Sequence, residues 1–539
     1  MKDRKFEHIE LFAGCGGMSL GLEAAGFDLF MANELSPMAG ETFAFNLLGE
    51  DLSKLASENK YSQKVFWINS KFEKDDLKNR LRENPFEIIK KKVCDINFDF
   101  DFGGKLIVGN IDLLLNFLKK NKELCRSLKE RNIDLLSGGP PCQGFSLAGK
   151  RLKDDIKNGL PLSFANFAEL IQPKVVLLEN VKGITSPFKT SDGIKHIAWL
   201  EVSKAFAIKG FVPICMLLNS KYFGVPQNRP RFILLAFRKD IFDRLKSKSE
   251  NSDLTNSILD KSSLFYHKVG KCQNNLEKVI PADLTVYNIE NYLGLFDGTL
   301  FPKYSTNEKE FLNAYDAIED ISITNRRYKI KEIKNNYAQR LSSLFKPRFP
   351  LKFVDIQNHE SRNHTFIVKA RFRFFQVLNS KNGLRLEASK LLSGRSFDEQ
   401  TLREIYYDLK YEKLLLRYKS GVKLNTIKDF SHFKEFLNEI KSKKHSQRAI
   451  KKTEPAPAQM TIPDDLCHYS ENELRTLTVR EMARFQSFPD WFVFRSKVTT
   501  GGKLRSVEVP QYTQVGNAVP PILAYELGQT IKNVLKSIE

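Results

Sequence analysis

A cysteine stands among residue types that would hold it rigidly at the end of a strand. Residues 138–146 read GGPPCQGFS, and they follow the apolar run Ile133 to Leu136, which is typical of a buried parallel strand. Proline fixes φ and removes a backbone donor, while glycine permits unusual turns. Cys142 is therefore displayed on a stiff loop, where a thiolate could act as a nucleophile. The plainer interpretation is a cysteine that is merely packed in the core.

Other chemically capable motifs accompany Cys142. The sequence FAGCGG at 12–17 precedes it, and the motifs ENV at 179–181, QNRPR at 227–231 and QVGNAV at 514–519 follow in that order. This company favours a catalytic cysteine over a merely packed one.

The elements around the first motif predict a nucleoside pocket. A strand is expected over 6–12 and a helix over 18–26, and a glycine turn between them lets backbone N–H groups approach a ligand closely. Glu34 ends the second expected strand, about twenty residues after the turn, where a carboxylate can accept both hydroxyls of a ribose. Such a pocket would suit a nicotinamide cofactor or S-adenosylmethionine, although a strict GxGxxG is absent.

Alternating strands and helices predict an α/β fold with a mostly parallel sheet. The carboxyl ends of its strands should bring Cys142, Glu179 and Glu34 to one rim, where ligands bind in open sheets. The linker 222–227 would deliver Arg229 and Arg231 to the same region. Further strands are expected at 105–108, 133–136, 174–178, 210–218 and 231–237, with helices at 113–128, 164–171 and 520–535.

This ordered set of motifs resembles the DNA (cytosine-5)-methyltransferases that use S-adenosylmethionine, over roughly residues 5–238 and 475–537. The resemblance implies a Rossmann-like methyltransferase fold, with helices on both faces of the sheet. It implies a catalytic domain of residues 1–238 and 475–539, and a target-recognition domain inserted at 239–474.

The same resemblance implies roles for the polar residues. Cys142 would add to C6 of a flipped-out cytosine, Glu179 would stabilise N3, and Arg231 would hydrogen-bond O2. Arg229 would orient Glu179 or a phosphate. The base that removes the C5 proton is not identified, and a water molecule is plausible.

The resemblance also implies a pocket for S-adenosylmethionine, whose product is S-adenosylhomocysteine. Glu34 would bind the ribose. Asn110 would accept from the adenine amino group where the family usually has aspartate, with Asp95 as a rival. Glu10 also stands where the family commonly has aspartate. The remaining contacts would come from Phe12, Gly14, Gly16, Gly17, Pro140 and Asn517.

Charge favours a nucleic-acid partner. The formal net charge is +21, and residues 321–450 hold 29 Lys+Arg against 12 Asp+Glu. Aromatic residues are interleaved with arginine at 371–375 (RFRFF), which suits base stacking and phosphate contacts or a strand with alternating faces. We expect double-stranded DNA as partner and a companion restriction endonuclease, with the enzyme acting as a monomer.

Several segments outside the motifs carry plainer expectations. Residues 49–104 are expected to cover one sheet edge, and 148–159 form either a lid or an ordinary loop. Helices are expected over 384–418, 430–440 and 475–485, with Arg480 and Glu481 in structural roles. The histidines of 358–364 lack HExxH spacing, so no metal is expected. The seven cysteines should be reduced, and without an apolar leader or membrane span we expect a cytoplasmic protein.

Three other functions compete with this interpretation. An RNA cytosine-5 methyltransferase would share the chemistry, although the large basic insert favours DNA. A catalytically silent DNA-binding regulator would need none of Cys142, Glu179 and Arg231, which are all present. A nicotinamide enzyme is the weakest alternative.

Overall fold

The structure is a computed structural model, and it describes most of the chain. The described residues are 5–87, 89, 92–141, 159–189, 195–248, 252–322, 326–379, 381, 392, 398–442, 447–459 and 461–539. Cys142 and nearly all of the expected lid therefore lie outside the described residues.

A nine-stranded sheet forms the centre of the molecule, in the order β12-β9-β11-β6-β5-β1-β2-β4-β3. Only β11 among these strands runs antiparallel to its neighbours. The mostly parallel α/β fold is therefore confirmed. The strands are β1 (Phe6–Leu11), β2 (Phe27–Glu34), β3 (Val65–Trp67), β4 (Lys105–Val108), β5 (Leu135–Gly138), β6 (Val175–Val181), β9 (Phe211–Asn219), β11 (Pro230–Arg238) and β12 (Val286–Asn288).

The register aligns the carboxyl ends of the parallel strands at one rim. Leu11 at the end of β1 pairs with Gly138 at the end of β5, and Glu34 at the end of β2 pairs with Val108 at the end of β4. The turns that follow these strands therefore lie side by side.

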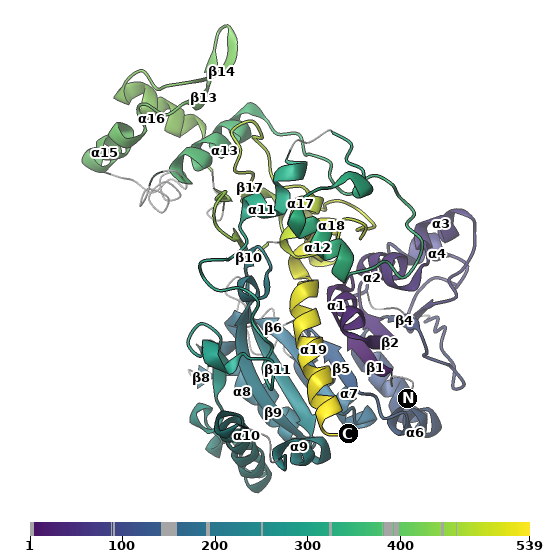
Figure 1. Cartoon of the computed structure of the whole chain (residues 1–539). Helices are drawn as coiled ribbons and strands as arrows, with labels where there is room; N and C mark the ends of the chain where they lie inside the picture. Colours follow the sequence, from purple (N-terminus) through teal and green to yellow (C-terminus); the bar gives the residue numbers. More distant parts are fainter. Residues whose placement is uncertain are drawn as a thin grey trace.

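Helices cover both faces of the sheet, and each face has its own apolar cluster. One face carries α1 (Gly17–Ala25), α2 (Pro37–Phe43) and α19 (Pro521–Ser537), as Figure 1 shows. The other carries α5 (Ile111–Lys120), α6 (Lys122–Glu130), α7 (Leu160–Ile171) and α8 (Ala198–Ile208). The single helix expected at 113–128 is two helices, because Asn121 caps α6 by accepting from Leu124 N at 3.1 Å.

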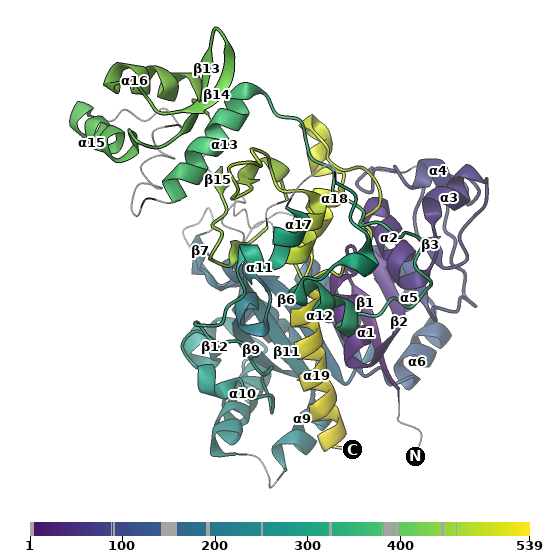
Figure 2. The same cartoon turned by 45° about the horizontal axis from the view of Figure 1, so that its top comes forward.

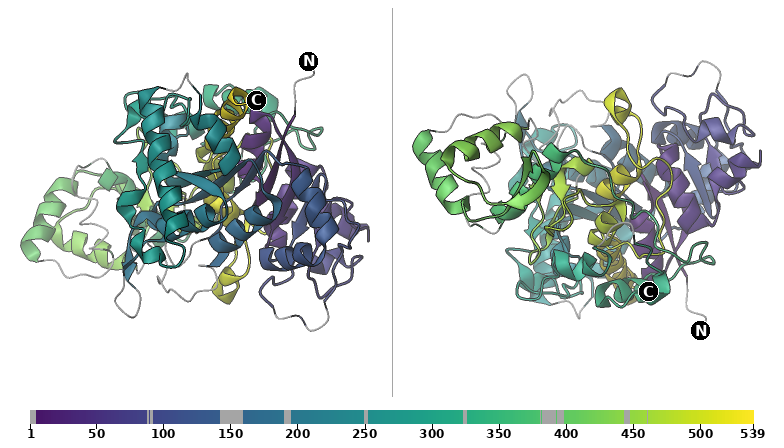
Figure 3. Two further views of the ribbon diagram at one scale, coloured as in Figure 1. Left: turned by 90° about the horizontal axis from the view of Figure 1, so that it is seen from below. Right: turned by 90° about the horizontal axis from the view of Figure 1, so that it is seen from above.

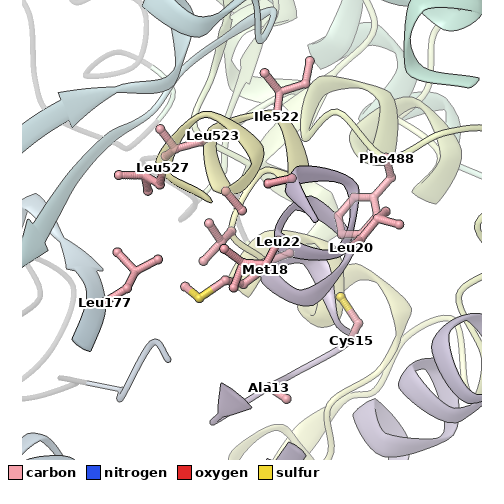
Figure 4. Packing of buried hydrophobic residues seen from close by; sticks show 14 of the residues in the cluster. Ala13, Cys15, Met18, Leu20, Leu22, Leu177, Phe488, Ile522, Leu523 and Leu527 are labelled. Carbon is pink, nitrogen blue, oxygen red and sulfur yellow. The ribbon is translucent and has the colours of Figure 1, made fainter. Parts of the chain in front are cut away.

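The C-terminal helix returns to the beginning of the chain. Leu523 and Leu527 of α19 pack near Met18 and Leu22 of α1 (Figure 4). A Cβ on Gly17 would lie 2.5 Å from the carbonyl oxygen of Val519, so only glycine permits this close approach.

The sheet domain continues beyond residue 238, where a domain boundary was expected. Helices α9 (Lys239–Lys246) and α10 (Asp253–Lys271) pack on the sheet, and β12 adds a parallel edge strand to β9. The apolar side chains of α9 and α10 pack on the sheet, but the local sequence does not show whether two such helices belong to the sheet domain or to the insert. At the opposite edge, residues 49–104 contribute α3 (Leu52–Ser57), α4 (Leu77–Arg80) and β3, which confirms that this segment covers the edge.

A separate lobe follows residue 365 and lies to one side of the sheet (Figures 2 and 3). It has its own apolar core. Its elements are α13 (Phe366–Asn379), α15 (Glu399–Leu409), β13 (Leu414–Tyr418), β14 (Gly421–Asn425) and α16 (Phe430–Glu439).

Two expectations for this lobe were wrong. Residues 371–375 are helical, and Phe372, Phe374 and Phe375 are core residues rather than stacking platforms. The helix expected over 384–418 gives way to β13, because Leu414 and Leu416 bury their side chains as part of a hairpin.

Short elements join the lobe and the insert to the sheet domain. The chain leaves through α11 (Ala314–Ile318) and α12 (Asn336–Leu344), and it returns through α17 (Val479–Phe485) and α18 (Gln511–Asn517). Two small parallel pairs also link the parts: β10 (Gln227–Asn228) with β16 (Ala456–Pro457), and β15 (Arg448–Ala449) with β17 (Leu466–Cys467).

Buried arginines of α17 hold this junction, as expected for a structural role. Arg480 donates to the carbonyl oxygens of Gln357, Pro489 and Phe492. Glu481 forms a bidentate pair with Arg475, with both distances 2.8 Å.

Candidate active site

The turn after β1 has the backbone shape of a ligand cradle. Phe12, Gly14 and Gly16 have φ values of 55°, 56° and 94°, in the left-handed region that glycine adopts most easily. A Cβ on Gly14 would meet no atom within 4 Å, so its surface is open. The turn leads into α1, whose first residue is Gly17.

Glu34 connects this turn to the next strand. Its Oε2 accepts from Gly14 N and its Oε1 from Ser36 N, both at 2.8 Å. Burial raises the pKa of this carboxyl, and the two backbone donors oppose the rise. Each oxygen keeps a second lone pair, so the carboxylate fits the paired hydroxyls of a ribose.

Asn110 lies at the same rim, in the turn after β4. Its exposed side chain caps α5, with Oδ1 accepting from Asp112 N at 2.7 Å. The rival residue Asp95 is enclosed instead, because both its oxygens accept from Arg80, at 2.7 and 3.0 Å. Asn110 is therefore the more accessible of the two for an adenine contact.

The residues that lead into Cys142 pack against the end of β6. Asn180 Nδ2 donates to the carbonyl oxygen of buried Pro140 at 2.9 Å. A Cβ on Gly139 would lie 3.0 Å from Glu179 Oε2, so the glycine allows the carboxylate to approach the loop. The structure thus places Glu179 beside the chain that enters Cys142.

Glu179 and Arg231 form an ion pair at this rim. Arg231 Nε lies 2.7 Å from Glu179 Oε1, and each side chain is about one-tenth exposed. Burial lowers the pKa of Arg231, while the Glu179 carboxylate raises it. The antiparallel strand β11 makes the pair possible, since Arg231 stands opposite Val181.

Arg229 contacts the C-terminal turn. Its Nη2 donates to the carbonyl oxygens of Gly516 and Ala518, at 2.8 and 3.0 Å. These residues flank exposed Asn517. Among the described residues, no hydrogen bond joins Arg229 to Glu179, although burial lowers the pKa of Arg229 and the Glu179 carboxylate raises it against that effect. The guanidinium of Arg229 instead holds the Asn517 turn.

Two glutamines that sequence reasoning missed complete this support. Gln486 Nε2 donates to the carbonyl oxygen of Val515 at 2.8 Å, and Gln227 Nε2 donates to Phe485 O and to Gln486 Oε1, at 2.9 and 3.2 Å. Both are fully buried. Gln227 belongs to the QNRPR motif, so its presence there was the available signal.

The histidines of 358–364 serve packing within the described structure. His359 Nδ1 lies 3.0 Å from Thr478 Oγ1, and His364 Nε2 lies 3.3 Å from Thr476 Oγ1. The described residues contain no cluster of three or more His, Cys, Asp or Glu side chains that could hold a metal ion. Among the same residues, no helix is long and apolar enough to cross a bilayer.

Comparison with known proteins identifies the family to which this chain belongs. The family description "C-5 cytosine-specific DNA methylase" matches residues 6–68 and 91–533. The chain belongs to that family. It is a DNA cytosine-5-methyltransferase.

Relatives resemble this methyltransferase over almost their full length. The type II methyltransferase M.DdeI of Desulfomicrobium norvegicum is 24% identical, over 98% of this chain and 89% of its own. M.XorII of Xanthomonas oryzae is 25% identical, over 98% and 85%. A solved structure from E. coli, titled a DNA modification methyltransferase of a prophage, has 19% identity and a TM-score of 0.49 and covers 98% and 99% of the two chains.

Proposed function

We propose that this methyltransferase modifies a specific duplex sequence through a covalent bond between Cys142 and C6 of a flipped-out cytosine. The observation that carries the proposal is the Glu179–Arg231 pair, which lies beside the loop that leads into Cys142. Cytosine activation requires a carboxylate and a guanidinium that can act on the base while a thiolate attacks it, and the buried Glu179–Arg231 pair supplies the first two groups.

Each residue would act on a different atom of the base. C5 of cytosine is a poor nucleophile until the Cys142 thiolate adds to C6, which raises electron density on the ring. Glu179 shares a proton with N3 and so stabilises that density, while Arg231 donates to O2. After methylation, a base removes the C5 proton, the C6–S bond breaks, and the thiolate leaves.

The turn residues would hold S-adenosylmethionine, which supplies an electrophilic methyl group when bound. Phe12, Gly14, Gly16 and Gly17 would accommodate its methionine part, and Glu34 its ribose. The open surface of Gly14 and the free lone pairs of Glu34 fit this assignment. Asn110, Pro140 and Asn517 would complete the pocket.

Residues beyond the sheet domain would read the DNA sequence. The lobe at 366–442 and the basic segments around it form the part of the chain with the largest positive excess. We assign target recognition to them. We also place the enzyme in a restriction-modification system with a companion endonuclease, because its relatives are named type II methyltransferases.

Trapping tests the proposal directly. A duplex with 5-fluorocytosine at the target cannot lose a C5 proton, so the enzyme should remain covalently attached to it in the presence of S-adenosylmethionine. The wild-type enzyme should give a shifted band on a denaturing gel, and Cys142→Ser should give none while still binding DNA. Absence of the band from an enzyme that methylates normal duplex would refute the covalent mechanism.

A further inference from the structure

The hairpin β13–β14 projects from the lobe away from the central sheet (Figures 1 and 2). Its base is anchored, because Leu414 and Leu416 are buried in the lobe core. Its second strand, Gly421–Asn425, is exposed at every residue. An isolated two-stranded hairpin is only marginally stable in water. The outer strand β14 therefore contributes little to the packing of the lobe. Packing alone does not explain why this exposed strand is part of the protein.

Positive charge is concentrated on this hairpin and its flanks. Residues 410–428 contain six Lys or Arg and one acidic residue, Glu412. The adjoining helices have the opposite balance, with one basic and four acidic residues at 398–409, and one basic and three acidic at 429–439. Most acidic residues at 398–439 thus lie on or next to the helices, and the hairpin presents a separate, mainly cationic surface.

Two lysines of the hairpin are available to a partner: Lys419 directly follows β13, and Lys423 is the middle residue of β14. Lys419 and Lys423 are exposed, and no ion pair with a described residue is recorded for either. Lys423 stands opposite Leu416, on the hairpin face that also carries Tyr418. Tyr418 Oη accepts from Asn425 Nδ2 at 3.1 Å, which links the last residue of β13 to the last residue of β14.

We propose that the β13–β14 hairpin binds the phosphate backbone of duplex DNA outside the target sequence, with Lys419 and Lys423 as the contacting residues. The inference rests on the proposed function, since it requires a duplex held at the rim. Duplex DNA carries one negative charge per about 1.7 Å of its axis, so a cationic ribbon finds partners all along it. Such a contact adds affinity without reading bases.

The attachment of the lobe supports this placement. The chain returning from the lobe pairs β16 with β10, and β10 is followed by Arg229, Pro230 and Arg231. The lobe therefore rises beside the catalytic rim, and DNA that leaves the rim on that side extends toward the hairpin.

The double variant Lys419→Ala/Lys423→Ala tests the inference. Duplex affinity is measured by fluorescence anisotropy with S-adenosylhomocysteine, over a series of salt concentrations, on a long duplex and on a short one that ends close to the target. We expect the double variant to bind the long duplex about tenfold more weakly. The slope of log Kd against log salt concentration should also be shallower by about 1.8, because two phosphate contacts are lost. Binding to the short duplex should not change.

Lys271→Ala/Lys278→Ala is the matched control, since it also removes two exposed lysines, at the far end of α10. It should leave both affinities at the wild-type value. Wild-type affinity and salt dependence for the hairpin variant on the long duplex would refute the inference, as would an equal loss on both duplexes. Trapping by 5-fluorocytosine in the same variant reports separately on the proposed function.

Discussion

Glu179 and Arg231 neutralise each other at the rim, so removing one charge leaves the other buried without compensation. Glu179→Gln keeps the shape of the side chain but can no longer share a proton with N3. We expect the rate of single-turnover methylation to fall by about 10²–10⁴, the usual contribution of general acid–base groups. Glu169→Gln, which removes an exposed carboxylate paired with Lys209, should react at the wild-type rate. A Glu179→Gln rate within twofold of wild type would exclude Glu179 from the chemistry.

A second buried carboxyl makes stability depend on pH. Glu10 of β1 contacts Ser19 Oγ, and burial raises its pKa to about 8, with smaller contributions from Glu34 and Glu23. The folded protein therefore holds this proton more tightly than the unfolded chain. The stability from Glu10 is complete below its ordinary pKa near 4.5 and is lost as pH rises toward 8.

Glu10→Gln should remove that dependence, because the amide does not ionise. The difference in urea midpoint between variant and wild type should move in favour of the variant from pH 5 to pH 8, by an amount equivalent to about 1.4 kcal/mol per pH unit at most. Parallel unfolding titrations at four pH values measure it. A constant difference across this range would contradict a raised Glu10 pKa in the folded protein.

Glu34 and Arg229 show how far residue types alone could be interpreted. Glu34 was assigned to the rim from its place at a strand end, and the structure puts it there beside Gly14. Arg229 was expected to orient Glu179 or a phosphate, but its hydrogen bonds include those to the carbonyl oxygens of Gly516 and Ala518, which the motif did not predict. A motif predicts which element carries a side chain, but it does not predict hydrogen-bond acceptors on a turn almost three hundred residues later in the sequence.

At the level of elements, the turn between α18 and α19 depends on buried amides. Gln486→Leu would remove two buried hydrogen bonds, one to Val515 O and one from Gln227 Nε2, at a cost of about 0.5–1.5 kcal/mol each. Because this turn carries Asn517, we expect the affinity for S-adenosylmethionine to fall about tenfold, the equivalent of about 1.4 kcal/mol. Isothermal titration calorimetry measures it.

Gln339→Leu is the comparison for that variant, since Gln339 is an exposed glutamine that also donates to a carbonyl oxygen, Ile333 O. It should bind the cofactor like wild type. If Gln486→Leu also binds normally while losing thermal stability, the glutamine supports only the fold and does not position the pocket.

Apolar runs made the strands of the sheet predictable, because each buried parallel strand needs a short continuous apolar segment. Residues 371–375 show where that argument ends. RFRFF alternates like a strand, but Phe372 and Phe375 are spaced for one helical face, and α13 buries them in the lobe core. The three-residue strand β12 was equally hidden, since its pairing with β9 is decided by tertiary contacts.

The described residues form three apolar cores, which have two different origins in the sequence. The cores on the two faces of the sheet gather residues from both ends of the chain, whereas the lobe core draws almost entirely on residues 370–449. The lobe was expected within a larger inserted domain, and the boundary could not be placed from sequence because α9, α10 and β12 continue the sheet domain after Arg238.

Arg484 joins the departing and returning parts of the insert to each other. It is fully buried, and it donates to Asp490 Oδ1 at 2.9 Å and to Ala317 O at 3.0 Å, with Asp320 as a further partner. Breaking a buried ion pair by removing one partner typically costs about 3–5 kcal/mol. Arg484→Leu should therefore destabilise the sheet domain by about that amount.

Hydrogen exchange can locate this loss. Amides of α11 and α17 should lose protection in Arg484→Leu, while those of α13 and α16 should keep it, because the lobe core does not include the junction. Arg403→Leu, which breaks an exposed pair with Glu399 on α15, should cost less than about 1 kcal/mol and leave the junction protected. Equal loss of protection in α11 and α16 would mean that the lobe and the sheet domain unfold as one cooperative unit. The lobe core would then not be independently stable, although it is spatially separate.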